Sequence, residues 1–215
     1  MKFIYFNWTP ILVPFFIGLF KFRHFDKNLK LVFLFVCFGT FTEVVSRLLM
    51  LLAGVSNTMP INNLYGIGSF VLLFLLYFYV LGDFVNKRIF TLLSIIFTFY
   101  WIVDTLFIQS DFIFSSFPRA IGQIFVIILA ILYYYKVMVE AKIVKLADEP
   151  FIWINTAILI YYTGTLFFYI LFNLILEYSR EFSKITVYYF SILNALFYIL
   201  IAIGFLKAGK TKAIN

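Results

Sequence analysis

The chain has 215 residues, of which 64% are hydrophobic and 13% are charged, and its mean hydropathy is +1.03. A soluble globular protein is nearer half apolar and a quarter charged, and one of this size cannot bury so much apolar surface. The same composition excludes a disordered chain, and the single cysteine, Cys37, excludes a disulfide scaffold. The composition therefore predicts an integral membrane protein.

Seven stretches are long and apolar enough for helices that cross the bilayer, each of which needs about 20 residues. In chain order they cover 3–20, 31–53, 62–81, 89–109, 117–136, 151–174 and 185–206. The first is interpreted as a retained helix and not a cleaved signal peptide, because Pro10 and Pro14 interrupt it and no small-residue cleavage site follows. The prediction is an all-α fold, a single seven-helix transmembrane bundle over residues 1–215 with no soluble domain.

Lysine and arginine residues are distributed unevenly over the loops. Twelve of the 17 fall on the side that holds loops 21–30, 82–88 and 136–149 and the C-terminal tail, four fall on the other side, and Arg47 lies inside a span. The more basic side is expected to face the cytoplasm, which places the N-terminus outside and the C-terminus inside. Basic loops beside anionic lipid account for the net charge of +7, so no direct nucleic-acid binding is expected.

Polar and ionisable side chains inside the spans are costly in a membrane, so each one is a candidate functional residue. The second span carries Glu43 near its midpoint and Arg47 one turn further out on the same face. Asn63 and Tyr65 open the third span, and Asp104 lies about one turn below the outer surface in the fourth.

The later spans continue this pattern. Arg119 opens the fifth span, and Gln123 lies one turn deeper. Tyr161 and Tyr162 lie near the middle of the sixth span, and Asn194 lies on a polar face of the seventh. The inner half of the bundle is almost wholly apolar by comparison, so the polar faces are expected to converge in a pocket that opens outward and is closed toward the cytoplasm.

The sequence predicts that this pocket binds a small ligand, a lipid or an ion. Its predicted lining residues are Glu43, Arg47, Asn63, Tyr65, Asp104, Arg119, Gln123, Tyr161, Tyr162 and Asn194. A purely structural role stays open as the alternative, because Glu43 can pair with Arg47, and Asp104 with Arg119, as ion pairs that hold helices together.

Few catalytic or cofactor sites fit the sequence. His24 is the single histidine and lies in a basic loop, so with one cysteine the chain lacks the three ligands that a catalytic zinc needs. The last span has no lysine to carry retinal, and no glycine-rich phosphate loop is present. No cofactor and no metal are predicted. One enzymatic alternative stays open, an intramembrane lipid hydrolase in which Glu43 or Asp104 acts as general acid or base.

Several of these positions form a longer pattern. It comprises an acid in the second helix, an Asn and a Tyr opening the third, an Arg opening the fifth, an aromatic-Trp-Ile-Asn block leading to Ile-Tyr in the sixth, and an Asn in the seventh. The matching residues are Glu43, Asn63, Tyr65, Arg119, residues 151–155, Ile160, Tyr161 and Asn194. In this the chain resembles a group of small, uncharacterised bacterial seven-helix membrane proteins. It departs from them at Ser69, where relatives often carry an acid. The resemblance implies a multi-pass protein of the inner membrane and no particular activity.

The main functional hypothesis is a non-enzymatic sensor or transporter with an outward-facing pocket. A sensor would signal through a separate cytoplasmic protein that docks on the basic loops 21–30 and 136–149. The alternative is an effector that assembles into a homo-oligomer or a pore, or a membrane accessory protein of an RNA-guided antiviral defence system. A discrete oligomer with a polar path along its axis would favour this alternative.

Overall fold

The computed structural model describes residues 9–55, 57–108, 116–141, 143, 145–178 and 180–209, without the side chains at 83, 108, 170–178, 180–184, 186 and 187. This part of the chain folds into seven α-helices and contains no strand, which confirms the all-α prediction. The helices are α1 (Thr9–Lys21), α2 (Lys27–Leu52), α3 (Met59–Leu81), α4 (Lys87–Val103), α5 (Ser116–Glu140), α6 (Pro150–Tyr178) and α7 (Arg180–Lys207). Each of the seven predicted stretches overlaps one of them.

Six of the helices, α2 to α7, are long and apolar enough to cross a membrane. The third of the six extends from α4 into a π-helical turn, Asp104–Ile108. The first helix, α1, has 13 described residues, and the rest of the predicted first span, residues 3–8, lies outside the described part of the chain. Six such helices in one chain suggest a multi-pass membrane protein.

Local sequence signals explain where several helices begin and end. The Asp26 carboxylate caps α2 by accepting a hydrogen bond from a first-turn backbone N–H at 2.8 Å, and the Asn86 amide oxygen caps α4 in the same way. At the other end of α2, Gly54 adopts a φ of +63°. This left-handed turn lets the Val55 N–H donate to the Leu49 carbonyl at 3.2 Å and stops the helix.

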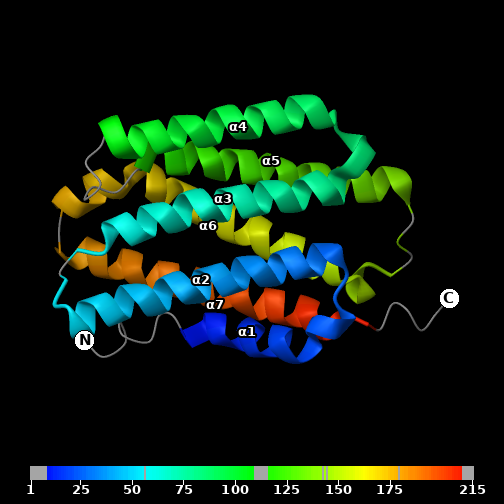
Figure 1. Cartoon of the computed structure of the whole chain (residues 1–215), viewed down its shortest axis with the longest axis horizontal. Coiled ribbons are helices and arrows are strands. Elements are labelled where there is room, and N and C mark those ends of the chain that lie inside the picture. Colours follow the sequence, from blue (N-terminus) through cyan, green and yellow to red (C-terminus); the bar gives the residue numbers. More distant parts are fainter. Residues whose placement is uncertain are drawn as a thin grey trace.

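The helices lie side by side (Figure 1), and the contacts of six of them close a ring. Around the ring, α1 contacts α2, α2 contacts α3, α3 contacts α5, α5 contacts α6, α6 contacts α7, and α7 contacts α1 again. The remaining helix, α4, stands outside this ring and packs against α3. The six ring helices therefore surround the interior of the bundle.

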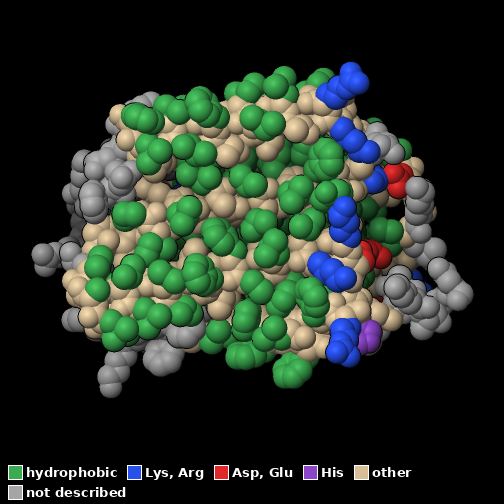
Figure 2. Space-filling model, viewed as in Figure 1, with side chains coloured by type: hydrophobic (Ala, Val, Ile, Leu, Met, Phe, Trp, Pro, Cys, Tyr) green, Lys and Arg blue, Asp and Glu red, His purple; other side chains and the backbone are tan. Residues whose placement is uncertain are grey.

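Lysine and arginine side chains gather at one end of the bundle, which we call the basic end (Figure 2). The described residues there are Lys21, Arg23, Lys27, Lys30, Lys87, Arg88, Lys136, Lys145 and Lys207. The side chains of Lys2, Arg180 and Lys184, which the sequence assigns to the other side, are not among the described ones. The C-terminal ends of α1 and α7 lie together at the basic end (Figure 1).

Lysines at the basic end hold the ends of neighbouring helices. Lys136 of α5 donates from Nζ to the carbonyls of Val80 and Leu81 at 2.7 and 3.0 Å, and so caps the C-terminus of α3. Lys21 of α1 donates to the Leu206 carbonyl of α7 at 2.7 Å. Both lysines place positive charge where the helix dipole is negative and satisfy carbonyls that have no partner within the helix.

One buried polar residue ties three ring helices together near the basic end. Asn155 of α6 is fully buried. Its Oδ1 accepts a hydrogen bond from the Tyr77 hydroxyl of α3 at 2.6 Å, and its Nδ2 donates to the Ala130 carbonyl of α5 at 3.0 Å. Interhelical hydrogen bonds of this kind fix the relative register of helices in a bundle.

Candidate functional site

A cavity opens inside the ring at the end opposite the basic end, and we call it the large cavity. Its volume is about 370 Å³, within the range of small-molecule sites. Every ring helix contributes to its wall. The polar wall residues are Thr42, Glu43, Ser46, Arg47, Thr58, Asn62, Tyr65, Arg119, Tyr161, Tyr169, Asn194 and Tyr198.

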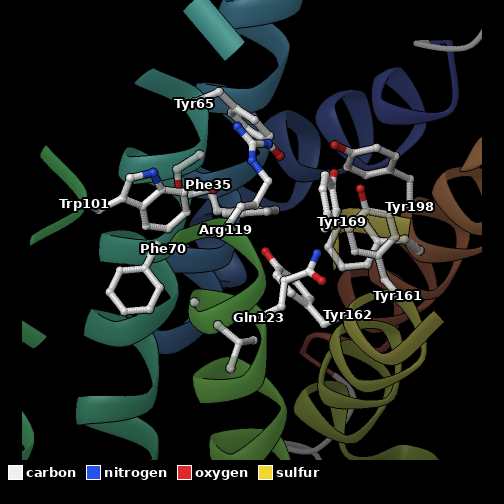
Figure 3. Close-up of a pocket in the computed structure, with 15 residues that line it drawn as sticks. Phe35, Tyr65, Phe70, Trp101, Arg119, Gln123, Tyr161, Tyr162, Tyr169 and Tyr198 are labelled. Atoms are coloured by element: carbon white, nitrogen blue, oxygen red, sulfur yellow. Dashed lines mark hydrogen bonds between the residues drawn. The ribbon is translucent and has the colours of Figure 1, made fainter. Parts of the chain in front are cut away.

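A second space of about 40 Å³, which we call the small chamber, adjoins the large cavity (Figure 3). The two share five wall residues, Tyr65, Arg119, Tyr161, Tyr169 and Tyr198. The wall of the small chamber also contains Trp101 and Gln123. Its volume is sufficient for a few water molecules, so the two spaces form one polar site with a wide part and a narrow part.

Arg119 lies in the walls of both spaces and is only 7% exposed. Its Nη2 donates a hydrogen bond to the Asn62 backbone carbonyl at 2.9 Å, and its guanidinium lies 5.5 Å from the centroid of the Tyr169 ring. A Cβ atom at Gly66 of α3 would lie 2.7 Å from this Nη2. The glycine therefore makes the room in which the guanidinium packs directly against α3.

Five tyrosine side chains lie around Arg119 (Figure 3). They are Tyr65 from α3, Tyr161, Tyr162 and Tyr169 from α6, and Tyr198 from α7. Tyr65 and Tyr198 are joined by a hydrogen bond between their side chains. Guanidinium and phenolic O–H groups make this wall rich in hydrogen-bond donors.

Glu43 and Arg47 line the large cavity one helical turn apart on α2. Arg47 Nε lies 3.6 Å from Glu43 Oε2, which confirms the pairing that their spacing predicts. The side chain of Arg47 is 25% exposed, and that of Glu43 is 47% exposed. The pair therefore lies in the accessible part of the cavity, and Arg119 lies in its buried part.

Gln123 faces the small chamber from one turn beyond Arg119. Its Nε2 donates to Thr165 Oγ1 at 3.0 Å, and its Oε1 has no hydrogen-bond partner among the described residues. The same is true of the indole N–H of Trp101, in the same wall. Gln123 is 4% and Trp101 is 3% exposed. Buried polar atoms are nearly always satisfied, so these two atoms remain available to hydrogen-bond a polar group near the small chamber.

Eight of the ten predicted site residues line one or both spaces. Glu43, Arg47 and Asn194 line the large cavity, Gln123 and Tyr162 line the small chamber, and Tyr65, Arg119 and Tyr161 line both. The ring therefore brings together polar residues from α2, α3, α5, α6 and α7, as the polar faces of the sequence predict. Whether these residues bind a ligand stays a prediction.

Asn63 and Asp104 lie in neither wall. Asn63 is 2% exposed, and it is its neighbour Asn62 that reaches the large cavity. Asp104 is 4% exposed and lies in the π turn that follows α4, the helix outside the ring. In the described part of the chain, Glu43 and Asp104 therefore do not share a cavity, and the enzymatic alternative gains no support from their placement.

Several wall residues were absent from the predicted site, among them two tyrosines that line both spaces. Tyr169 follows Tyr162 by seven residues on α6, and Tyr198 follows Asn194 by four on α7. Both spacings place the second residue on the same helical face as the first. Extending each polar face by one further turn or two would have found them, but aromatic residues are so frequent in this chain that a single tyrosine is a weak signal.

An apolar layer fills the ring between the small chamber and the basic end. It consists of Phe35, Phe70, Leu73, Leu76, Val126, Ile158, Phe197 and Ile201. Each of these side chains is at most 3% exposed, and the space left among those nearest the basic end is about 10 Å³. The polar site is therefore separated from the Tyr77–Asn155 pair, which lies on the far side of this layer.

The described residues contain no group of three or more His, Cys, Asp and Glu side chains that could hold a metal ion. The site offers hydrogen-bond donors, two arginines and one carboxylate. This set is suited to holding a polar molecule by charge and hydrogen bonds.

No protein-family model, curated protein or solved structure matches the chain. The resemblance to small bacterial seven-helix membrane proteins therefore stays a prediction. What the site does has to be inferred from its own residues.

Proposed function

We propose that this protein is a multi-pass membrane protein of sensor or transporter type that binds a small ligand in the large cavity. The observation that carries the proposal is the cavity itself, about 370 Å³ of polar-walled space inside a ring of otherwise apolar helices. Polar residues in such surroundings are costly unless they serve a ligand or each other. A space of this size among them favours a ligand.

The proposed orientation places the basic end in the cytoplasm of a bacterial cell and the large cavity on the outer side. The distribution of lysine and arginine supports it, because basic residues concentrate on the cytoplasmic side of membrane proteins. In this orientation α1 would complete a seventh span together with the residues before Thr9. The ligand would enter from outside the cell.

The apolar layer favours a binding protein over an open pore. Water and ions do not pass a constriction whose side chains are packed and apolar. A sensor with this architecture carries no output domain in the described chain, so its signal would pass to a cytoplasmic partner at the basic end. A transporter would instead need a second state in which the layer opens.

Thermal unfolding of the purified protein in detergent, across a library of ions, metabolites and amphiphiles, tests the proposal. The informative variant is Tyr169→Phe, which removes one hydroxyl from the cavity wall and keeps the aromatic side chain. Its matched control is Tyr135→Phe on the outer face of α5, where the side chain is 53% exposed. We expect at least one compound to raise the Tm of wild type and control clearly more than that of Tyr169→Phe.

Two results would contradict the proposal. One is a library in which no compound stabilises the wild type. The other is a stabilising compound whose effect is equal in all three proteins. A compound that stabilises the wild type and the control more than Tyr169→Phe is then tested for uptake into proteoliposomes. A transporter accumulates the compound, and a sensor does not.

A further inference from the structure

We infer that the small chamber holds an uncharged, hydroxylated end of the ligand, which donates a hydrogen bond to Gln123 and accepts one from Trp101. This inference rests on the ligand-binding function proposed above and names the chemical class of the ligand, a compound with a glycerol-like or other polyol end. It follows from the acceptors and donors in the wall of the small chamber and from the size of that space.

The orientation of the Gln123 amide is fixed by its neighbour on α6. Thr165 Oγ1 donates its proton to the Tyr161 carbonyl at 2.8 Å, so toward Gln123 it can only accept. The Gln123 atom that lies 3.0 Å from Thr165 Oγ1 is therefore the amide nitrogen, Nε2. The amide oxygen, Oε1, is left as a buried acceptor without a partner among the described residues, beside the tyrosines of α6 (Figure 3). A group that fills this part of the chamber has to donate a hydrogen bond.

Ser69 adds a second acceptor to the same wall. Its hydroxyl donates to the Gly66 carbonyl of its own helix at 2.9 Å, which leaves the lone pairs of Oγ to accept. A carboxylate or a phosphodiester carries only acceptors, so it would face Gln123 Oε1 and Ser69 Oγ without a hydrogen bond. These two side chains therefore disfavour an anionic group in this part of the chamber.

Trp101 supplies a donor from the helix outside the ring. Its indole reaches the chamber wall between Gly66 of α3 and Gly122 of α5. A Cβ would lie 3.1 Å from the indole at Gly66 and 3.0 Å from it at Gly122, so these glycines allow the close packing that holds the ring. The buried indole N–H has no partner among the described residues and can only donate. An ammonium group cannot accept this bond, and the described wall contains no carboxylate to pair with a cation.

A hydroxyl group is the smallest uncharged group that both donates and accepts, so it matches Gln123 and Trp101 together. About 40 Å³ has room for a few water molecules, and therefore for one or two hydroxyl groups with their carbon atoms. The hydroxyls of Tyr161 and Tyr162 line the same space and can donate or accept. The rest of the ligand extends into the large cavity, which shares five wall residues with the small chamber.

Two sources could supply these hydroxyl groups, a soluble polyol and the glycerol headgroup of a lipid. The experiment therefore has two arms, both on the full chain purified in a detergent without hydroxyl groups. In the first arm, glycerol is compared with sodium acetate and methylammonium chloride, a small anion and a small cation, at constant ionic strength. In the second arm, phosphatidylcholine nanodiscs contain either phosphatidylglycerol or phosphatidic acid. These two lipids share an anionic phosphate, and only phosphatidylglycerol carries a glycerol headgroup with free hydroxyls.

We expect glycerol or phosphatidylglycerol to raise the Tm by about 5 °C when the site is saturated. The same compound should shift the fluorescence emission of Trp101, because its indole N–H gains an acceptor, and Trp101→Phe should lose that shift. Trp153 should contribute no shift, since its N–H already donates to the Ala147 carbonyl at 2.9 Å. Acetate, methylammonium and phosphatidic acid should do neither. A response to glycerol identifies a soluble ligand, and a response to phosphatidylglycerol alone identifies a lipid headgroup.

Variants assign the effect to the chamber, with affinity measured by titrating the emission shift. Gln123→Met keeps the length of the side chain and removes the acceptor, and we expect it to weaken binding about tenfold. Thr165→Val leaves Gln123 in the chain but removes the atom that orients its amide. We expect it to weaken binding by a smaller factor, and it keeps the test valid if Gln123→Met folds poorly. Its matched control is Thr163→Val, an exposed position of α6 whose hydroxyl also donates to the carbonyl four residues back, and this variant should bind like the wild type.

The possible contradictions are distinct. Equal responses to phosphatidic acid and phosphatidylglycerol, or a response to acetate or methylammonium without one to glycerol, would overturn the inference and leave the proposed ligand-binding function standing. Equal affinity in wild type, Gln123→Met and Thr165→Val would also overturn it, because the effect would then come from elsewhere. No response in either arm would overturn the inference alone if a compound of the library above binds, and both proposals if none does.

Discussion

Arg119 and Asn155 are both buried polar residues inside the ring, but their surroundings differ. Asn155 uses both ends of its amide in hydrogen bonds to two neighbouring helices, and it lines neither the large cavity nor the small chamber. Arg119 borders about 370 Å³ of cavity and lies beside a glycine that makes room for it. The free volume beside a polar residue, more than its burial, therefore separates a structural role from a binding role in this bundle.

The Tyr77–Asn155 hydrogen bond should contribute to the free energy of unfolding and should leave ligand affinity unchanged. Tyr77→Phe leaves Asn155 Oδ1 buried without its donor, so we expect the free energy of unfolding to fall by about 1–2 kcal/mol. Denaturant titration in detergent measures this. Tyr79→Phe, on the same helix with a 39% exposed side chain, should change it by much less. Ligand affinity should be unchanged in both, because the apolar layer lies between Tyr77 and the cavity.

Glu149, just before α6 at the basic end, should make stability depend on pH. Partial burial and the nearby Asp26 carboxylate raise its pKa above the ordinary value of 4.5, against an opposing hydrogen bond from the Phe151 N–H. A carboxyl with a higher pKa in the folded state binds its proton more tightly when folded. The contribution of this group to the free energy of unfolding therefore rises as pH falls through the folded pKa toward 4.5, and its charge destabilises the fold above that range.

Replacing the carboxyl removes this dependence. We expect Glu149→Gln to raise the Tm by about 1–2 °C at pH 7, the scale of a weak charge interaction. The difference from wild type should shrink as the pH is lowered toward 4.5. Thermal unfolding at several pH values between 4 and 7 measures it. A gain that is the same at every pH would show that the carboxylate charge is not its cause.

At the scale of helices, the C-terminus of α3 depends on a side chain from another helix. Lys136 satisfies the Val80 and Leu81 carbonyls from α5. Lys136→Met keeps the length and apolar part of the side chain and loses both bonds, so we expect a loss of about 1–2 kcal/mol in the free energy of unfolding. Lys145→Met, at an exposed position of the same end, is the matched control. A loss of equal size in both would mean that net charge, not the cap, sets the stability of this end.

The helices themselves were largely predictable from the sequence. Their apolar runs are long, and their ends carry strong local signals such as Asp26, Asn86 and Pro150, so each observed helix overlaps a predicted stretch. The Glu43–Arg47 pair was predictable because it is local to one helix. Such features depend on neighbours in the sequence and need no knowledge of the tertiary fold.

The arrangement of the helices was not predictable in the same way. The position of α4 outside the ring removes Asp104 from the cavity, although Asp104 is as deeply buried among side chains as Arg119. The division of the polar site into two spaces and the role of Gly66 depend on which helices are in contact. A single sequence does not reveal the contacts between helices. The polar residues were therefore identified well, and their grouping less completely.

For the whole molecule, the proposed orientation predicts which positions an external reagent reaches. In a Cys37→Ala background, Val55→Cys lies between α2 and α3 at the end opposite the basic end, and Lys145→Cys lies at the basic end. A membrane-impermeant maleimide applied to intact cells should label Val55→Cys strongly. It should label Lys145→Cys only after the membrane is permeabilised. The reverse pattern would invert the orientation and place the cavity in the cytoplasmic half.

The apolar layer also decides where a membrane potential would fall across this protein. Water that enters the large cavity reaches the wall at Arg119, so in the proposed orientation most of the potential drops across the packed side chains between there and the basic end. A charged ligand that binds from outside moves through little of that field, so its affinity is nearly independent of voltage. Moving a charge onward across the layer changes its free energy by about 2.3 kcal/mol per 100 mV. A transporter that carries a charged ligand through this layer therefore responds to the membrane potential, whereas a sensor works at the same affinity in energised and de-energised membranes.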